Sequence, residues 1–292
     1  MRIDTGRPAT TSPHRRSEWQ RFRARRRAVI GAGLLVFLWL AAGLAPVVAP
    51  YDLDRQEPGA SAAPPSLRHP LGTDGFGRDV LSRTLWGGRV SQTIGLLSMV
   101  VSIGVGILVG GLAGYRGGVA DEALTRLTEA VTTFPSVFLL ITLVAVFGAS
   151  VPLLIAAIGL TAWPTTARLV RAEFLALRAR DFVQAASALG AGSSRVMWRH
   201  ILPNVVPVII VAATLRVAYV ILIEAGLSYL GVGVPAPAAT WGGMVADGRE
   251  HVFHAWWIAF FPGLAIFLTV MAYNLVGDGL RDALDPKGLA SP

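Results

Sequence analysis

Cysteine is absent from this sequence of 292 residues, and lysine occurs only once, at position 287. Without cysteine the chain has no disulfide framework, no thiolate zinc site and no cysteine nucleophile, although the compartment is left open. Charged residues are scarce, because they make up 15% of the chain where a soluble domain carries about 25%. Hydrophobic residues make up 53%, and the mean hydropathy is +0.55. We therefore expect lipid to surround much of the chain.

The sequence signatures of common catalytic sites are missing as well. The chain contains no G-x-x-x-x-G-K-[ST] loop for ATP, no H-E-x-x-H metalloprotease motif and no G-x-S-x-G nucleophile elbow. The pair Ser193 and Ser194 lies in a basic segment without an evident base or oxyanion arrangement. We expect that the chain is not an enzyme and that it binds no cofactor of its own.

Two groups of residues could suggest a metal site. His69, Asp74 and Asp79 lie close in sequence, but their turn-rich context favours turn formation and helix capping over metal binding. His251 and His254 lack a third ligand in a clear register. We expect no metal centre in the chain.

Six apolar segments of about 20 residues are long enough to cross a bilayer with a hydrocarbon core of about 30 Å. An open sheet would leave backbone groups unsatisfied in lipid, so all six are predicted to be helices. The first could instead be a signal peptide, but its length of about 22 residues exceeds the 7 to 15 of a signal core and favours a retained anchor. The predicted fold is an all-α polytopic membrane protein. Its six transmembrane helices are expected at 28–49, 91–114, 129–148, 151–170, 205–226 and 256–277.

The arginines predict the orientation. Of the 26 basic residues, nineteen lie in the segments that six spans would place on the side of the N-terminus, and five in the segments on the other side. The positive-inside rule then places both termini in the cytoplasm of a cell-membrane protein, and it explains the net charge of +8 by contact with the bilayer, without nucleic acid. The first 20 residues are expected to be disordered. The predicted division is a basic segment 1–27, a first helix 28–49, an outside loop 50–85, a five-helix core 86–279 and a tail 280–292.

Several residues inside the spans predict packing or a pathway. Gly106, Gly110 and Gly114 recur every four residues, a spacing that lets helix backbones approach closely in lipid. Phe134-Pro135 and Trp163-Pro164 are expected to kink or break their helices, and such breaks line pathways or are ordinary packing features.

Arg216 and Glu224 are charges within the fifth apolar segment, so each should face protein or a water-filled cavity. They lie about 80° apart around a helix, which is too oblique for a direct pair. Together with Pro164 they are candidate pathway residues. Two alternatives remain open: a structural hydrogen bond between helices, or a position of Glu224 at the outer interface. The following segment, 227–255, resembles a partly re-entrant outside lid.

The cytoplasmic loop 171–203 contains the stretch DFVQAASALGAGSSRVMWRHILPN. Asp181 is a candidate N-cap, and Gly190 is suited to end the first short helix. A second helix is expected to start at Ser193 or Ser194 and to stop at Pro203. The small side chains at 185–188 give a smooth surface that could enter a groove on a partner.

This loop resembles the cytoplasmic loop of the membrane subunits of binding-protein-dependent ABC importers, whose pattern is E-A-A, three residues, G, nine residues, I-x-L-P. Gln184 occupies the first position in place of Glu, and His200 the position of the isoleucine. The resemblance implies that the loop couples to an ATPase. The residues that it assigns to coupling are Asp181, Gln184, Ala185, Ala186, Gly190, His200, Leu202 and Pro203.

Other segments resemble the peptide and nickel branch of that family, in particular the second of its two permease subunits. They are HPLGTDGFGRDVLSRTLWGGRVS, GYRGGVADEALTRLTEAVTTFPS, EAGLSYLGVGVPAPAATWGGM and GDGLRDALDP, and the resemblance covers residues 20–286. It implies a type I ABC importer permease fold and import of di- or oligopeptides, with nickel, glutathione or another small solute as alternatives. The implied partners are a homologous permease, two ATPase subunits or one fused ATPase that hold ATP and Mg, and an extracytoplasmic substrate-binding protein. A stand-alone secondary transporter or channel, and a membrane anchor, remain as other classes.

Overall fold

The computed structural model describes residues 18–284, and within that range it is helical and contains no strand. The expectation of disorder for the first 20 residues therefore lies outside the described residues, except that 18–20 are helical. The helices are α1 (Glu18–Ala24), α2 (Arg26–Gly43), α3 (Ala45–Val48), α4 (Val80–Arg116), α5 (Gly118–Thr133), α6 (Ser136–Phe147), α7 (Val151–Arg178), α8 (Asp181–Ala188), α9 (Ser193–Arg195), α10 (Leu202–Tyr229), α11 (Trp241–Gly248) and α12 (Trp257–Leu284).

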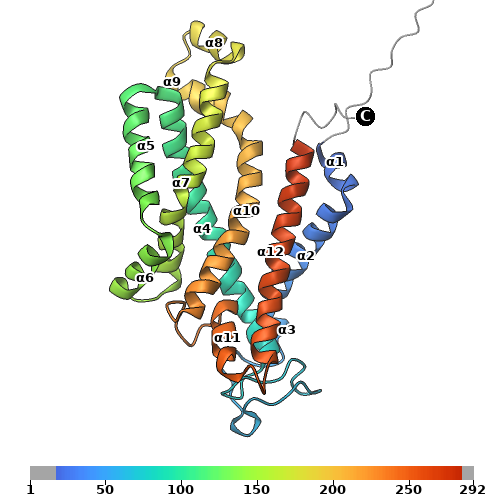
Figure 1. The fold of residues 1–292 in the computed structure, drawn as a ribbon. Helices are drawn as coiled ribbons and strands as arrows, with labels where there is room; N and C mark the ends of the chain where they lie inside the picture. The colour runs from blue at the N-terminus through green and yellow to red at the C-terminus, as the bar shows by residue number, and fades with distance from the viewer. Residues whose placement is uncertain (1–17, 285–292) are drawn as a thin grey trace, which may run out of the picture.

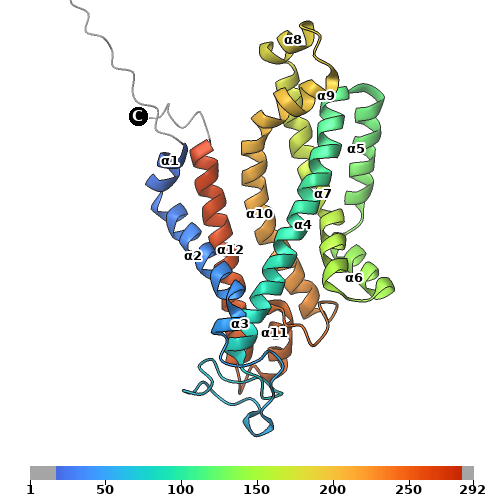
Figure 2. The same ribbon diagram turned by 180° about the vertical axis from the view of Figure 1, so that it is seen from behind.

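The long helices form an elongated bundle, and the segments that connect them differ between its two ends (Figure 1). The α8 loop projects from one end, and α11 together with the segment 50–79 covers the other. Helix α1 and the end of α12 both lie at the α8 end, which is the end that the arginine distribution assigns to the cytoplasm (Figure 2).

Five helical segments are long and apolar enough to span a membrane, and the pair of α5 and α6 makes a sixth if it counts as one bent span. The expectation of a single third helix at 129–148 is wrong, because α5 and α6 meet at an angle of 78°. The break falls at Phe134 and Pro135, as predicted, with Phe134 in an extended conformation (φ −82°, ψ 129°). The residue before a proline avoids the α conformation, and proline itself has no N–H for the helix ladder.

At Trp163-Pro164, where a kink or a break was expected, the helix is not broken. Helix α7 continues through Pro164, which is buried. In a packed bundle, neighbouring helices hold such a proline-containing turn in place.

The parallel helices α4 and α7 make the closest long contact of the bundle. A Cβ atom added at Gly106 would lie 2.5 Å from Cβ of Thr166, and one added at Gly114 would lie 2.7 Å from the backbone oxygen of Arg171. At Gly110 it would collide with the carbonyl group of Ala167. The three glycines therefore let the two backbones touch, and dispersion between them replaces the hydrophobic effect that lipid removes.

Helix α2 packs against the last helix, α12, in a similar way. A Cβ atom added at Gly31 would lie 2.7 Å from Cβ of Leu275, and one at Gly279 would collide with Ala28. Near the middle of this contact, Nε1 of Trp39 donates a hydrogen bond of 3.1 Å to the hydroxyl of Tyr273. Helices α2 and α12 are thus held together over much of the length of α2.

A buried polar junction joins α4, α10 and α11 near the outer end. Glu224, only 1% exposed, accepts hydrogen bonds from the hydroxyls of Ser91 (3.2 Å) and Ser228 (2.8 Å). Oγ of Ser91 in turn accepts from the backbone N–H of Trp241 at 3.1 Å. Of the interpretations that the sequence left open, the structure therefore shows Glu224 in hydrogen bonds between helices.

The segment 50–79 is held by its own acidic residues. Asp79 caps α4 by accepting from the N–H of Ser82 at 2.7 Å, and its other oxygen lies 3.0 Å from Nδ1 of His69. Asp74 accepts from the backbone N–H groups of Phe76 and Arg78, both at 2.9 Å. The predicted roles in turns and capping are therefore confirmed.

We predict that Gly110→Ala lowers the thermal unfolding midpoint of the chain in detergent, because overpacking of a tight contact costs about 1 to 3 kcal/mol. Gly104 in the same helix is the matched control, since a Cβ atom there meets nothing within 4 Å. Gly104→Ala should leave the midpoint unchanged or raise it. Equal midpoints for the two variants would contradict the assigned contact.

We also predict that Glu224→Ala lowers the midpoint by the equivalent of about 1 to 3 kcal/mol, because it leaves buried hydroxyls without their acceptor. Glu224→Gln keeps an acceptor at this position and should lose much less. Limited proteolysis should then cleave the segment around α11 faster in Glu224→Ala than in Glu224→Gln. Identical cleavage rates would show that the junction does not hold α11.

Candidate coupling loop and transport cavity

Helix α8 starts one residue earlier than a cap at Asp181 would require. The N-cap is Arg180, in an extended conformation, and Asp181 is the first helical residue and makes no capping hydrogen bond. The predicted N-cap role of Asp181 is therefore wrong. Its carboxylate still lies in the first turn, where the helix dipole favours a negative charge.

The end of α8 confirms the role predicted for Gly190. This residue has φ +83°, its N–H donates to the carbonyl of Ser187 (3.0 Å), and the N–H of Ala191 donates to that of Ala186 (3.1 Å). Paired bonds of this kind close a helix when the residue beyond it is left-handed, a conformation that glycine adopts without strain. The chain therefore turns sharply at Gly190.

The second helix begins at Ser193, as expected, but it does not stop at Pro203. α9 continues through a π-helical turn, Val196–Ile201, into α10, so helix is continuous from Ser193 to Tyr229. A π-turn skips a regular hydrogen bond, so the missing N–H of Pro203 is accommodated where the α register resumes. His200 lies in the π-turn, and its carbonyl accepts from Nδ2 of Asn204 at 2.7 Å. Leu202 is the first residue of α10.

One face of α8 is anchored to the bundle. Val183, 2% exposed, packs in a core with Phe174 of α7 and with Val196 and Ile201 of the π-turn. Nε2 of Gln184 donates to the carbonyl of Arg178 at 3.0 Å, so this side chain ties α8 back to the end of α7. A movement of α8 would therefore carry α7 and α10 with it.

The opposite face of α8 is free in this chain. Phe182 is 43% exposed and Leu189 is 89% exposed; Ala185 is also exposed, and Ala186 is half-buried. Figures 1 and 2 both show the loop standing clear of the bundle. The loop thus has an exposed apolar surface with small side chains.

An ion pair braces the same end of the bundle. Nε of Arg171 on α7 lies 2.5 Å from Oδ1 of Asp121 on α5, and its Nη2 lies 2.7 Å from Oδ2. Two hydrogen bonds of this kind fix both the distance and the relative orientation of the two side chains. Sequence reasoning missed it, because the partners are 50 positions apart and share no local pattern.

A cavity of about 220 Å³ lies where α5 and α6 break, and α7 and α10 supply its other walls. Arg216 and Pro164 line it together, with Tyr219 and several hydroxyl side chains. Glu224 is not among its lining residues. The structure therefore brings two of the three candidate pathway residues together and leaves Glu224 in the polar junction.

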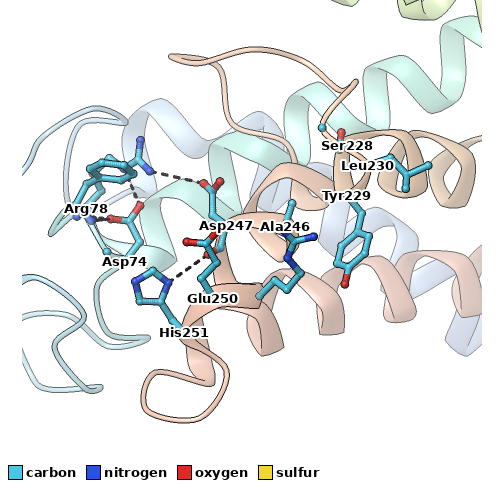
Figure 3. A pocket seen from close by; sticks show the side chains of 13 residues that line it. Asp74, Arg78, Ser228, Tyr229, Leu230, Ala246, Asp247, Glu250 and His251 are labelled. Atoms are coloured by element: carbon cyan, nitrogen blue, oxygen red, sulfur yellow. Dashed lines mark hydrogen bonds and ion pairs between the residues drawn. The ribbon is translucent and has the colours of Figure 1, made fainter. Parts of the chain in front are cut away.

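A larger cavity, of about 640 Å³, opens at the outer end (Figure 3). Figure 3 shows the side chains of Asp74, Arg78 and Asp247 facing one another, and Nη2 of Arg78 lies 3.7 Å from Oδ2 of Asp247. Burial raises the pKa of the Asp247 carboxyl, while Arg83 and Arg78 pull that pKa down. Nδ1 of His251 lies 3.3 Å from the carbonyl of Asp247. This outer cavity is lined by charges of both signs.

Comparison with protein families gives two matches. Residues 106–288 match the family described as binding-protein-dependent transport system inner membrane component. Residues 12–65 match the family described as the N-terminal TM domain of oligopeptide transport permease C. Together the two matches cover the first long helix, α2, and the part of the chain from residue 106 through α12.

Two relatives are similar over almost the whole chain. The oligopeptide transport system permease protein OppC of Bacillus subtilis is 40% identical over 267 residues, which cover 91% of this chain and 88% of the relative. The dipeptide transport system permease protein DppC of the same organism is 38% identical over 270 residues, 92% of this chain and 84% of the relative. The chain therefore belongs to the family of inner membrane components of binding-protein-dependent transport systems, and it is a multi-pass membrane permease of the ABC transporter class.

Proposed function

We propose that the chain is one of two permease subunits of an ABC importer for di- or oligopeptides. It would form half of the pathway, next to a homologous permease, and an extracytoplasmic binding protein would deliver the substrate. The names of its relatives OppC and DppC support a peptide substrate. Nickel, glutathione or another small solute would use the same machinery.

The α8 loop is the observation that carries this proposal. A short helix with one anchored face and one free apolar face, ended by a left-handed glycine, is suited to sit in a groove of another subunit. The groove would belong to two ATPase subunits or one fused ATPase, which would hold ATP and Mg. The permease itself is not catalytic.

Coupling would follow from the packing of the loop. Val183 connects α8 to α7 and α10, and both of these helices line the cavity at the break between α5 and α6. Nucleotide binding on the ATPase would shift α8, and the attached helices would open the cavity toward one side or the other. Such a switch requires that the two states differ in their contacts with the nucleotide-loaded partner.

The outer cavity would receive the binding protein. Its mixed charges, contributed by Asp74, Arg78, Asp247 and Glu250 among others, lie at the end opposite α8 and outside the long helices. Complementary charges on a partner would guide its docking.

We predict that Gly190→Leu leaves membrane insertion intact but abolishes substrate-stimulated ATP hydrolysis in the reconstituted complex. A leucine at φ +83° is strained even though a Cβ atom there meets nothing within 4 Å. The expected loss therefore comes from the backbone conformation.

Gly192 supplies the matched control for this variant. It is equally open but has φ −63° and ψ 152°, so Gly192→Leu should keep the stimulation. Normal stimulation in Gly190→Leu would contradict the coupling role of the loop. An equal loss in both variants would show that side-chain bulk matters and the left-handed turn does not.

A further inference from the structure

Arg216 is a charge without a counter-ion in the described part of the chain. It lies near the middle of α10, and none of the ion pairs among residues 18–284 includes it. Its only close polar contact is with the ring of Tyr219, whose centroid lies 5.5 Å from its guanidinium carbon. A guanidinium group at this depth costs about 2.5 to 3.5 kcal/mol, and a ring face supplies no hydrogen-bond acceptor for its five N–H groups.

The cavity beside Arg216 has a partly polar lining. Hydroxyl side chains reach it from four helices, α5, α6, α7 and α10, and the remaining lining is mainly apolar. The hydroxyl residues are Thr132, Ser136, Thr161, Thr165 and Tyr219. Thr161 already donates to the carbonyl of Ala157 (2.8 Å), whereas the hydroxyls of Ser136 and Thr165 make no such bond within the part of the chain that the structure describes. One cation and two free hydroxyls can therefore surround a single anionic group.

The volume of the cavity limits the size of the ligand part that it can enclose together with this anionic group. A volume of about 220 Å³ is below the 300 to 1,000 Å³ of sites that enclose a whole small ligand. It therefore fits one end of a longer molecule. The planar fork of a guanidinium group matches the two oxygens of a carboxylate.

We infer that Arg216 binds the C-terminal carboxylate of the peptide in transit, in the cavity between the α5–α6 break, α7 and α10. The inference rests on the proposed function, because it names the part of the substrate that the pathway recognises. Phe134 and Pro135, at the break between α5 and α6, are among the residues that line the cavity. Broken helices at membrane depth are tolerated where they line a cavity.

The test compares two forms of one tripeptide, with a free C-terminal carboxylate and with a C-terminal amide. The complete transporter, reconstituted in liposomes with its binding protein and ATP, takes up each form, and the ratio of the two rates is measured. The preference of the binding protein is the same for every variant. A change in the ratio between variants therefore reports the permease alone.

We expect Arg216→Gln to reduce the ratio of carboxylate to amide uptake by about tenfold or more, since a hydrogen-bonded charge contributes about 1.5 to 3 kcal/mol. Arg216→Lys keeps the charge and should retain part of the preference. Arg89→Gln is the control: Arg89 also lies over an aromatic ring, that of Trp86, but it does not line the cavity. Its ratio should equal that of the unchanged protein.

Other outcomes separate this inference from the proposed function. ATP hydrolysis stimulated by the loaded binding protein should persist in Arg216→Gln, and its absence in the unchanged complex would refute the proposed function itself. An unchanged uptake ratio in Arg216→Gln would overturn the inference. So would loss of assembly with the second permease, because Arg216 would then pair with a carboxylate of that subunit.

Discussion

The close contact between α4 and α7 is the constraint on which the rest of the structure depends. Lipid offers no hydrophobic drive for helices to associate, so contact at the level of the backbone must hold them together. Glycines at 106, 110 and 114 permit this contact over about two turns of α4. Because α7 leads directly into the α8 loop, the loop is attached to this closely packed pair. The ion pair of Asp121 with Arg171 adds α5 to the same unit.

Polar groups within the bundle have two different kinds of surroundings. Glu224 is fully enclosed and accepts hydrogen bonds from two serine hydroxyls, so it fastens the outer ends of α4, α10 and α11. Arg216, eight residues earlier on the same helix, has no hydrogen-bond acceptor among residues 18–284 and lines a cavity. A satisfied buried group stabilises the fold, whereas an unsatisfied one beside a cavity is available to a ligand. One helix therefore carries both a buried group that fastens the bundle and the cation that we propose as the ligand-binding residue.

Much of this organisation could be predicted from the sequence. Hydropathy placed five of the six spans on long helices, and local rules identified the break at Phe134 and Pro135, the left-handed Gly190 and the acidic caps of the outer loop. Errors arose where tertiary packing overrides a local signal: Pro164 and Pro203 were expected to break or end helices that continue. The contacts of Glu224 with Ser91 and of Arg171 with Asp121 could not be found, since the partners lie 133 and 50 positions apart and leave no periodic trace. The loop motif was recognised by its resemblance to the pattern of a known family, but its anchoring through Val183 required the structure.

A permease that depends on other subunits for energy should be unable to transport alone. The most direct test is peptide uptake by liposomes that contain the purified chain, either alone or assembled with the second permease, the ATPase subunits and the binding protein. The expected result is no uptake by the chain alone, and uptake by the assembly only when ATP and Mg are present on the ATPase side. Uptake by the chain alone, without ATP, would contradict the importer function and show a self-contained transporter or channel.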